Sequence, residues 1–146
     1  MEFLIKPHDG IGPIKLGMSR EQVKELLAGF FTLSDGASDH YFDSCLQIEF
    51  ENNSVDFIGV SHNAAFTVSY ENSNVFGIEG TALFYSIESN ESGNHCLNES
   101  EYLFPDQIIT LWDSDFQYDY IGNHKRNVWA QVGTGTKSYF QAVNGV

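Results

Sequence analysis

The sequence predicts an α+β fold, in which one antiparallel sheet carries helices on one of its faces. Three observations favour this class. Residues 19–29 have the apolar spacing and the start signals of a helix, residues 45–60 contain two strands around a short turn, and a similar order of elements recurs in the second half of the chain. The 146 residues are the size of one domain, so we expect a single domain over 1–146.

The first helix has the clearest local signals. Ser19 is a favourable N-cap residue, and Gln22 three positions later completes a capping box. Gly29 is a suitable residue to end the helix. Apolar residues recur at the spacing of one helix face, at Val23, Leu26, Leu27 and Phe30.

The strands of the first half are recognised by alternation. Residues 3–6 form a short first strand in this interpretation. Over 45–51, apolar and polar residues alternate, which is typical of a strand with one buried face. The Asn-Asn-Ser turn at 52–54 then leads into a partner strand over 55–60, and residues 65–70 add a further strand.

The second half has a similar order. A helix is expected over 81–89, with Leu83, Phe84 and Ile87 on one face. Strands follow at 108–112 and 126–132, joined by a long polar and aromatic loop, and 139–143 form a last edge strand. The two halves are therefore interpreted as pseudo-repeats of a helix-plus-hairpin unit over 1–75 and 76–146. With helices on one face, the opposite face of the sheet would be open to a partner.

Charge is the strongest feature of the composition. The formal net charge is −13, and no Lys or Arg occurs between Glu25 and His124, a stretch that holds 17 of the 20 carboxylates. The negative field of such a surface repels nucleic acid and anionic membranes and attracts basic proteins. We therefore expect a basic protein partner and neither nucleic acid nor membrane. The alternative is that the acidity serves only solubility.

The chain shows no signal peptide and no apolar run long enough to span a membrane, so we expect a cytoplasmic protein. Its two cysteines, Cys45 and Cys96, are accordingly expected to be free thiols.

Motifs for chemistry are weak. The Gly-rich segment at 133–138 lacks the adjacent Gly-Lys pair of a phosphate loop, because Thr136 intervenes. Asp113 and Asp115 have a spacing that calcium loops use, but the Gly and closing Glu of such loops are missing. We expect no catalytic residue, no cofactor and no metal. A small enzyme stays open as an alternative, since the partners of a catalytic Cys need not be near it in sequence.

The segment after Trp112 interleaves aromatic and acidic residues, a composition suited to anchoring a basic protein. The candidate partner-binding residues are Asp113, Asp115, Phe116, Tyr118, Asp119 and Tyr120. The alternative is that Trp112, Phe116 and Tyr118 face the core through strand alternation.

Two stretches resemble a known group of proteins. Residues 12–23 (Gly-Pro-Ile-Lys-Leu-Gly-Met-Ser-Arg-Glu-Gln-Val) resemble the helix entry of small proteins with the BamE/beta-lactamase-inhibitor-protein-like fold. The segments 102–105 (Tyr-Leu-Phe-Pro) and 110–112 (Thr-Leu-Trp) are similar to segments of small bacterial proteins, some of which are immunity proteins for contact-dependent or polymorphic toxins. The resemblance implies a two-copy, inhibitor-like fold. The lipoprotein signal and acylated Cys of the outer-membrane branch are not present in this sequence.

These expectations combine into one hypothesis. The chain is interpreted as an immunity or inhibitor protein that binds a basic toxin domain, such as a nuclease, and occludes it in the cytosol. The alternatives are a small cytosolic enzyme and an acidic nucleic-acid mimic or adaptor.

Overall fold

The computed structural model describes residues 1–118 and 125–144. It is mostly β, with 44% strand and 18% helix, and its strands form two sheets. The expected α+β class, with helices covering one face of one antiparallel sheet, is therefore wrong. A second sheet supplies much of the layer that the sequence assigned to helices.

The larger sheet has seven strands and is antiparallel throughout. Its spatial order is β10 (Glu101–Phe104), β11 (Ile109–Tyr118), β12 (Lys125–Gly135), β7 (Ser54–Val60), β6 (Leu46–Glu51), β5 (Ser38–Tyr41) and β4 (Phe31–Ser34). The smaller sheet is mixed, because β1 and β8 are parallel. Its order is β3 (Ile14–Lys15), β2 (Gly10–Ile11), β1 (Glu2–Lys6), β8 (Thr67–Tyr70) and β9 (Ser73–Asn74).

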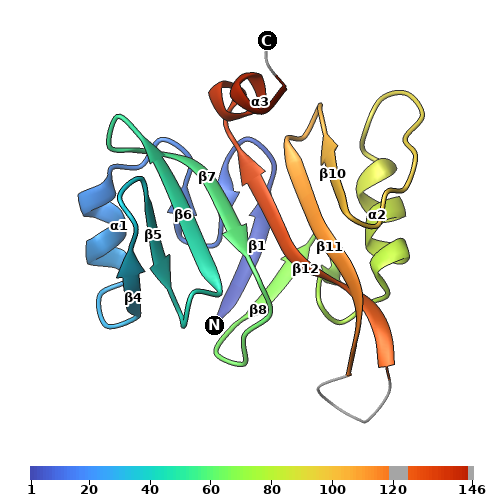
Figure 1. Ribbon diagram of the computed structural model, residues 1–146, viewed down its shortest axis with the longest axis horizontal. Coiled ribbons are helices and arrows are strands. Elements are labelled where there is room, and N and C mark those ends of the chain that lie inside the picture. The colour runs from blue at the N-terminus through green and yellow to red at the C-terminus, as the bar shows by residue number, and fades with distance from the viewer. Residues whose placement is uncertain (119–124, 145–146) are drawn as a thin grey trace.

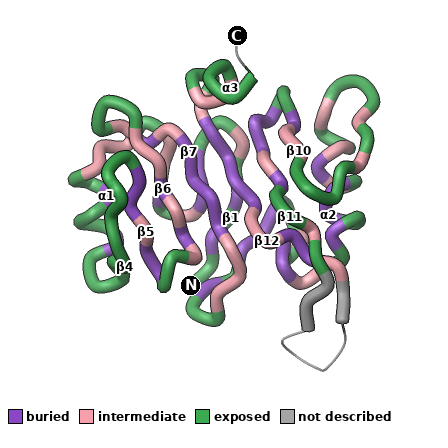
Figure 2. Tube along the Cα trace, in the orientation of Figure 1, coloured by how far each residue is buried: buried purple, intermediate pink, exposed green. Residues whose placement is uncertain are grey.

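The two sheets and two of the helices share one core. The small sheet lies behind the middle of the large one, with α1 (Arg20–Leu26) and α2 (Gly80–Glu88) towards its two ends (Figure 1). Buried residues concentrate along β7 and β12, in the middle of the large sheet (Figure 2). An apolar cluster draws on both sheets and on α1 and α2, including Phe3, Val23, Ile58, Phe84 and Trp129.

The expected start of the first helix is confirmed. Ser19 has extended backbone geometry, its Oγ accepts the N–H of Gln22 at 3.1 Å, and the Gln22 side chain accepts the N–H of Ser19 at 3.0 Å. The helix ends at Leu26, before the expected residue 29. Of the four residues predicted to form its apolar face, two are buried. Val23 and Leu27 are buried, whereas Leu26 and Phe30 are exposed.

The central hairpin and the second helix are also confirmed. β6 and β7 pair around the expected turn, and α2 buries the three apolar residues assigned to its inner face. The expected last strand at 139–143 is wrong, because α3 (Lys137–Asn144) is a helix. Its first turn begins where the Thr136 hydroxyl accepts the N–H of Tyr139 at 3.1 Å, and such a cap favours a helix.

None of the helices in the described ranges is long and apolar enough to cross a membrane. Whether 1–75 and 76–146 are copies of one unit stays a prediction. Each half does contain a helix followed by antiparallel strands of the large sheet.

One ion pair attaches α1 to the large sheet. Arg20 Nε and Nη2 donate to the two carboxylate oxygens of Asp39 in β5, at 2.9 and 2.6 Å. Arg20 Nη2 also donates to the carbonyl of Gly36 at 2.7 Å. The Asp39 side chain is 1% exposed and that of Arg20 is 21% exposed. The hydrogen bonds from Arg20 lower the pKa of Asp39 although burial opposes this.

We expect Arg20→Met to lower the free energy of unfolding by about 3–5 kcal/mol at pH 7, because it leaves a buried carboxylate without its partner. Because the pKa of Asp39 is lowered from its ordinary value of 3.8, the ionised carboxylate stabilises the folded protein at every pH above that value. This stabilisation is lost as pH falls through the pKa of the folded state. The variant should therefore approach the parent protein in acid, where its unpaired Asp39 takes up a proton.

Urea unfolding of both proteins at neutral and acid pH measures this difference. Lys24→Met is the control, because it removes the same charge from an exposed position on the same helix. An equal loss of stability in the two variants, or a loss that does not change with pH, would contradict the assigned role of the pair.

Candidate functional site

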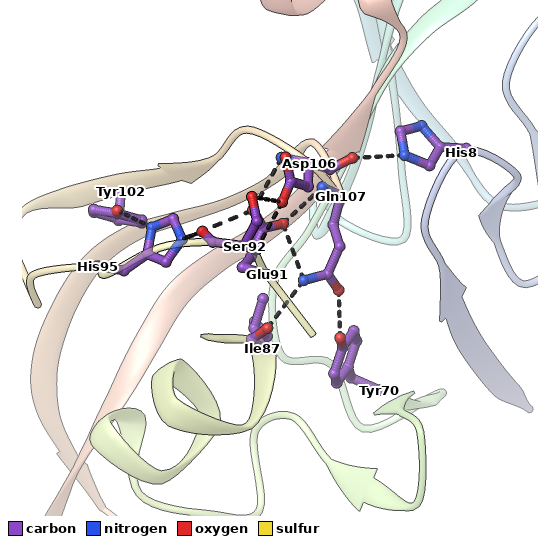
Figure 3. Close-up of polar contacts among 9 residues, drawn as sticks. All are labelled: His8, Tyr70, Ile87, Glu91, Ser92, His95, Tyr102, Asp106 and Gln107. Atoms are coloured by element: carbon purple, nitrogen blue, oxygen red, sulfur yellow. Dashed lines mark hydrogen bonds and ion pairs between the residues drawn. The ribbon is translucent and has the colours of Figure 1, made fainter. Parts of the chain in front are cut away.

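Two places in the structure gather polar side chains. The first is a cluster between the end of α2 and the turn at 105–108, which contains Glu91, Ser92, His95, Asp106 and Gln107 (Figure 3). Its mixture of histidine, serine and carboxylates resembles a hydrolase site in composition, so its hydrogen bonds decide whether it can act as one.

The hydrogen bonds of this cluster are satisfied internally. The Glu91 side chain is 0% exposed and accepts the backbone N–H groups of Asp106 and Gln107, at 3.0 and 2.7 Å. Both ring nitrogens of His95 are occupied, Nδ1 by the Tyr102 hydroxyl at 2.5 Å and Nε2 by the carbonyl of Ser92 at 2.8 Å.

The arrangement also lacks the relay that a nucleophilic serine needs. Ser92 Oγ donates to Asp106 at 2.5 Å, and His95 contacts the backbone of Ser92 at its carbonyl oxygen. Gln107 continues the network to the carbonyl of Ile87 at 2.9 Å and to the hydroxyl of Tyr70. The cluster therefore fastens α2, β8 and the 105–108 turn to one another.

The second place is the face of the large sheet that points away from the core, called here the open face. It holds a hollow of about 420 Å³ that spans strands β10, β11, β12, β7 and β6. Its lining is acidic and aromatic, with Glu49, Phe57, Glu101, Trp112, Gln131 and Tyr139.

Strand register explains why these residues share one face. Glu101 lies opposite Trp112, and Trp112 lies opposite Gln131, which forms one row across three strands. In a second row, Glu49 lies opposite Phe57, and Phe57 lies opposite Gly135. Opposed residues in an antiparallel pair project to the same side, so both rows point into the hollow.

Glycines form the floor between these rows. Gly59 and Gly133 are direct partners in the β7–β12 pair. A Cβ on Gly133 would lie 2.4 Å from the Phe57 ring, and one on Gly59 would lie 2.6 Å from the Gln131 amide. Side chains here would fill the hollow, so the glycines allow Phe57 and Gln131 to lie flat across the sheet.

Helix α3 forms one wall of the hollow. The Tyr139 ring stacks on Phe57 at 4.5 Å, directly over Gly135, whose Cβ would lie 2.5 Å from that ring. The strand end is fixed by Thr136, which donates to the Asp56 carboxylate at 2.5 Å, and Ser138 donates to Glu51 at 3.0 Å. In this way α3 covers part of the open face and leaves the Trp112 side uncovered.

The electrostatics of the hollow are one-sided. Burial raises the pKa of Glu49, and the nearby carboxylates of Asp56 and Asp35 raise it further. Burial likewise raises the pKa of Tyr139 to about 12, with the charges of Glu49, Asp56 and Glu101 adding to the effect. Within the described residues, neither Glu49 nor Glu101 forms an ion pair. The hollow therefore gathers negative charge that no ion pair among the described residues neutralises.

The candidate residues taken from the sequence lie beyond this hollow. The segment expected as a loop is strand up to Tyr118, since β11 and β12 continue as a long hairpin that extends past the rest of the sheet (Figure 1). Asp113 and Asp115 are exposed. Asp119 and Tyr120, together with the side chains of Phe116 and Tyr118, lie outside the described part of the structure. Their role in binding stays a prediction.

The strand changes the face that it presents at Asp113. This residue has a left-handed backbone with φ of 55°, a conformation that Asp tolerates better than most residues, and pairing with β12 continues on both sides of it. Before Asp113, Trp112 lines the hollow. After it, Ser114 and its partner Trp129 approach Gly80 of α2, and the Trp129 indole donates to the Gly80 carbonyl at 2.9 Å. The hairpin thus packs on α2, which the alternation of the sequence alone does not reveal.

Trp112 and Glu49 were missed as site residues. Trp112 is 52% exposed. The alternative interpretation of the sequence, in which strand alternation turns Trp112 towards the core, is therefore wrong. A usable signal was present at Glu49, which alternates with the buried Leu46 and Ile48 and hence faces away from the core. Nothing local marks Trp112 and Glu49 as parts of one site, because four strands, β7 to β10, lie between them in the sequence.

The described residues contain no group of three or more His, Cys, Asp or Glu side chains that could hold a metal ion. Comparison of the chain with protein-family models, with curated proteins and with solved structures finds no match.

We expect Glu91→Ala to lower the free energy of unfolding by about 2–4 kcal/mol, because it leaves buried N–H donors of Gln107 without an acceptor. Thermal or urea unfolding measures the effect. Glu99→Ala, an exposed position in the same region, should change stability by less than about 0.5 kcal/mol. Equal stabilities of the two variants would show that the cluster does not fasten α2.

Glu49→Gln is expected to raise the melting temperature at pH 7. The ordinary pKa of Glu is 4.5, and that of Glu49 is raised in the folded state, so its carboxyl group stabilises the protein when the pH is below 4.5. This contribution is lost as pH rises through the pKa of the folded state. The neutral amide avoids that loss.

The advantage of Glu49→Gln should vanish below pH 4.5. Melting curves from pH 4 to 8 test this, with Glu25→Gln on the exposed surface of α1 as the matched control. A lower melting temperature for Glu49→Gln, or an equal gain for Glu25→Gln, would contradict the electrostatic description of the hollow.

Proposed function

We propose that this chain is an immunity or inhibitor protein, which binds a basic toxin domain in the cytoplasm through the open face of the large sheet and occludes the toxin's active site. The observation that carries the proposal is the hollow around Trp112, where exposed aromatic surface adjoins unpaired carboxylates. Neither nucleic acid nor an anionic membrane fits a surface of this charge.

The shape of the hollow favours a protein partner. It has a glycine floor shared by β7 and β12, and it lies on the face of a seven-stranded sheet. An exposed Trp beside such a hollow is the kind of residue that carries much of the binding energy in protein interfaces. Exposed Glu101, beside Trp112 in register, adds charge at the rim.

The energetics of Glu49 support the same conclusion. Its environment disfavours the ionised form, yet the residue is a glutamate with two further carboxylates nearby. Clusters that reduce stability are typically kept where function requires them. A cationic group from a partner would neutralise this field and recover the lost stability on binding.

A nuclease toxin is the partner class that fits best. Such an enzyme holds phosphates with Lys and Arg side chains, so its active site presents positive charge. Carboxylates at Glu49 and Glu101 can face these groups while Trp112 packs against apolar surface next to them. Inhibition then requires only that the bound protein excludes the nucleic acid.

The predicted hairpin residues extend this surface. Asp113 follows Trp112 directly, and Asp115 is exposed on the same strand. A partner centred on the hollow therefore meets the hairpin at one side of the interface. The hairpin and the hollow are proposed as two parts of one binding surface.

The experiment is to express a basic toxin domain encoded beside the gene for this chain, with and without this protein. Growth should be restored only when both are present, and the two proteins should co-purify. Survival without co-purification, or turnover of the toxin's substrate by this chain, would favour the enzyme alternative.

Against such a partner, Glu101→Gln and Trp112→Ala should weaken binding in different ways. Loss of the rim charge should slow association, and the effect should fade near 0.5 M salt, where the Debye length is about 4 Å. Loss of the aromatic anchor should speed dissociation by about 30-fold, which corresponds to about 2 kcal/mol.

Surface-coupled binding kinetics separate the two effects. Glu25→Gln and Tyr85→Ala are the matched controls, because they remove an exposed acid from α1 and an exposed aromatic from α2. If all four variants bind alike, the open face is not the binding surface.

A further inference from the structure

The edge strand β4 presents an unusual surface. It ends the large sheet, and all four of its residues are exposed. Phe31 is 54% and Leu33 is 44% exposed, and Leu26 and Phe30 just before them are also exposed. Residues 26–34 include no charged side chain. Natural proteins usually protect such an edge with charge, proline or a covering element.

The other edge of the same sheet is protected. β10 carries Glu101, ends with the buried Phe104, and packs on α2 through contacts between Phe84 and Tyr102. Figure 2 shows β4 exposed along its length. The difference between the two edges indicates that the β4 edge has a specific role.

Apolar side chains lie on both faces of this edge. Phe31 is opposite Tyr41 and Leu33 is opposite His40, with a bulge between them, so the two side chains project to opposite faces. A strand added to β4 would therefore meet apolar surface on each side of the sheet.

A small hollow beside β4 adds a second observation. It measures about 290 Å³ and is lined by Lys24, Leu27, Ala28, Phe31 and Tyr41. The Tyr41 residue is 1% exposed, and its hydroxyl has no hydrogen-bond partner in the described structure. A buried hydroxyl without a partner is costly, so a polar group arriving from outside would stabilise it.

We propose that β4 is a self-association edge, at which a second copy of this chain pairs antiparallel with β4 about a two-fold axis. Charge selects this occupant. Two copies of a chain with net charge −13 repel one another over most of their surfaces, and the uncharged segment 26–34 is where they can approach. A basic partner would find no carboxylate on β4 itself, whereas the open face offers several.

The pairing joins two seven-stranded sheets into one and covers Phe31 and Leu33 of both copies. A short edge buries little area, so the dimer is expected to be weak, with a dissociation constant on the order of 10–100 μM. Both copies of Trp112 stay uncovered, because β11 lies near the opposite end of the sheet. The inference therefore stands apart from the proposed toxin-binding function.

Sedimentation of the full chain across this concentration range, at low and high salt, is the test. The dimer fraction should rise with concentration, and it should also rise with salt, because screening removes repulsion between like-charged copies. Hydrogen exchange at high concentration should protect amides of residues 31–34 and leave those of 101–104 unchanged.

Leu33→Lys should abolish the dimer, and Phe31→Lys is a second variant in case the first perturbs folding. Tyr85→Lys, at an equally exposed aromatic of α2, should leave it intact. The proposal is overturned if the parent is monomeric at several times the upper concentration, if dimerisation falls with salt, or if folded Leu33→Lys and Phe31→Lys proteins still dimerise.

Discussion

The large sheet buries apolar residues on one face, because the small sheet, α1 and α2 all pack there. The opposite face is left for polar and aromatic side chains, and α3 covers part of it. Gly59, Gly133 and Gly135 make this face hollow, since any side chain at these positions would collide with Gln131, Phe57 or Tyr139. The one-sided core thus determines where a partner can bind.

The same one-sided core separates the carboxylates that stabilise the fold from those that line the hollow. Asp39 receives a buried arginine partner and Glu91 receives backbone N–H groups, so these two carboxylates stabilise the fold. Glu49 and Glu101 receive no ion pair within the described residues and lie around the hollow instead. With 20 acids against 7 Lys and Arg, basic side chains are too few to pair with most of the carboxylates. Carboxylates that gather on a concave face therefore add to one negative field.

Prediction from sequence succeeded where signals are local. The capping box at Ser19, the β6–β7 hairpin and the inner face of α2 depend on residues a few positions apart. It failed at β5, because the Ser-Asp-His-Tyr sequence of this strand shows no apolar alternation. Asp39 can be buried there since it pairs with Arg20 of α1, and no local pattern reveals that pair. It also failed at the β11–β12 hairpin, where packing of Trp129 against α2 extends the strands past the expected loop.

The sequence by itself determined the sign of the surface, the start of α1, the central hairpin and the presence of a face turned away from the core. Composition and short-range spacing carry that information directly. Tertiary structure decided the two-sheet architecture, the position of α3, and the grouping of Glu49, Glu101 and Trp112 around one hollow. These features depend on which strands become neighbours, and long-range strand pairing is selected by the packing of the whole chain, so no local pattern records it.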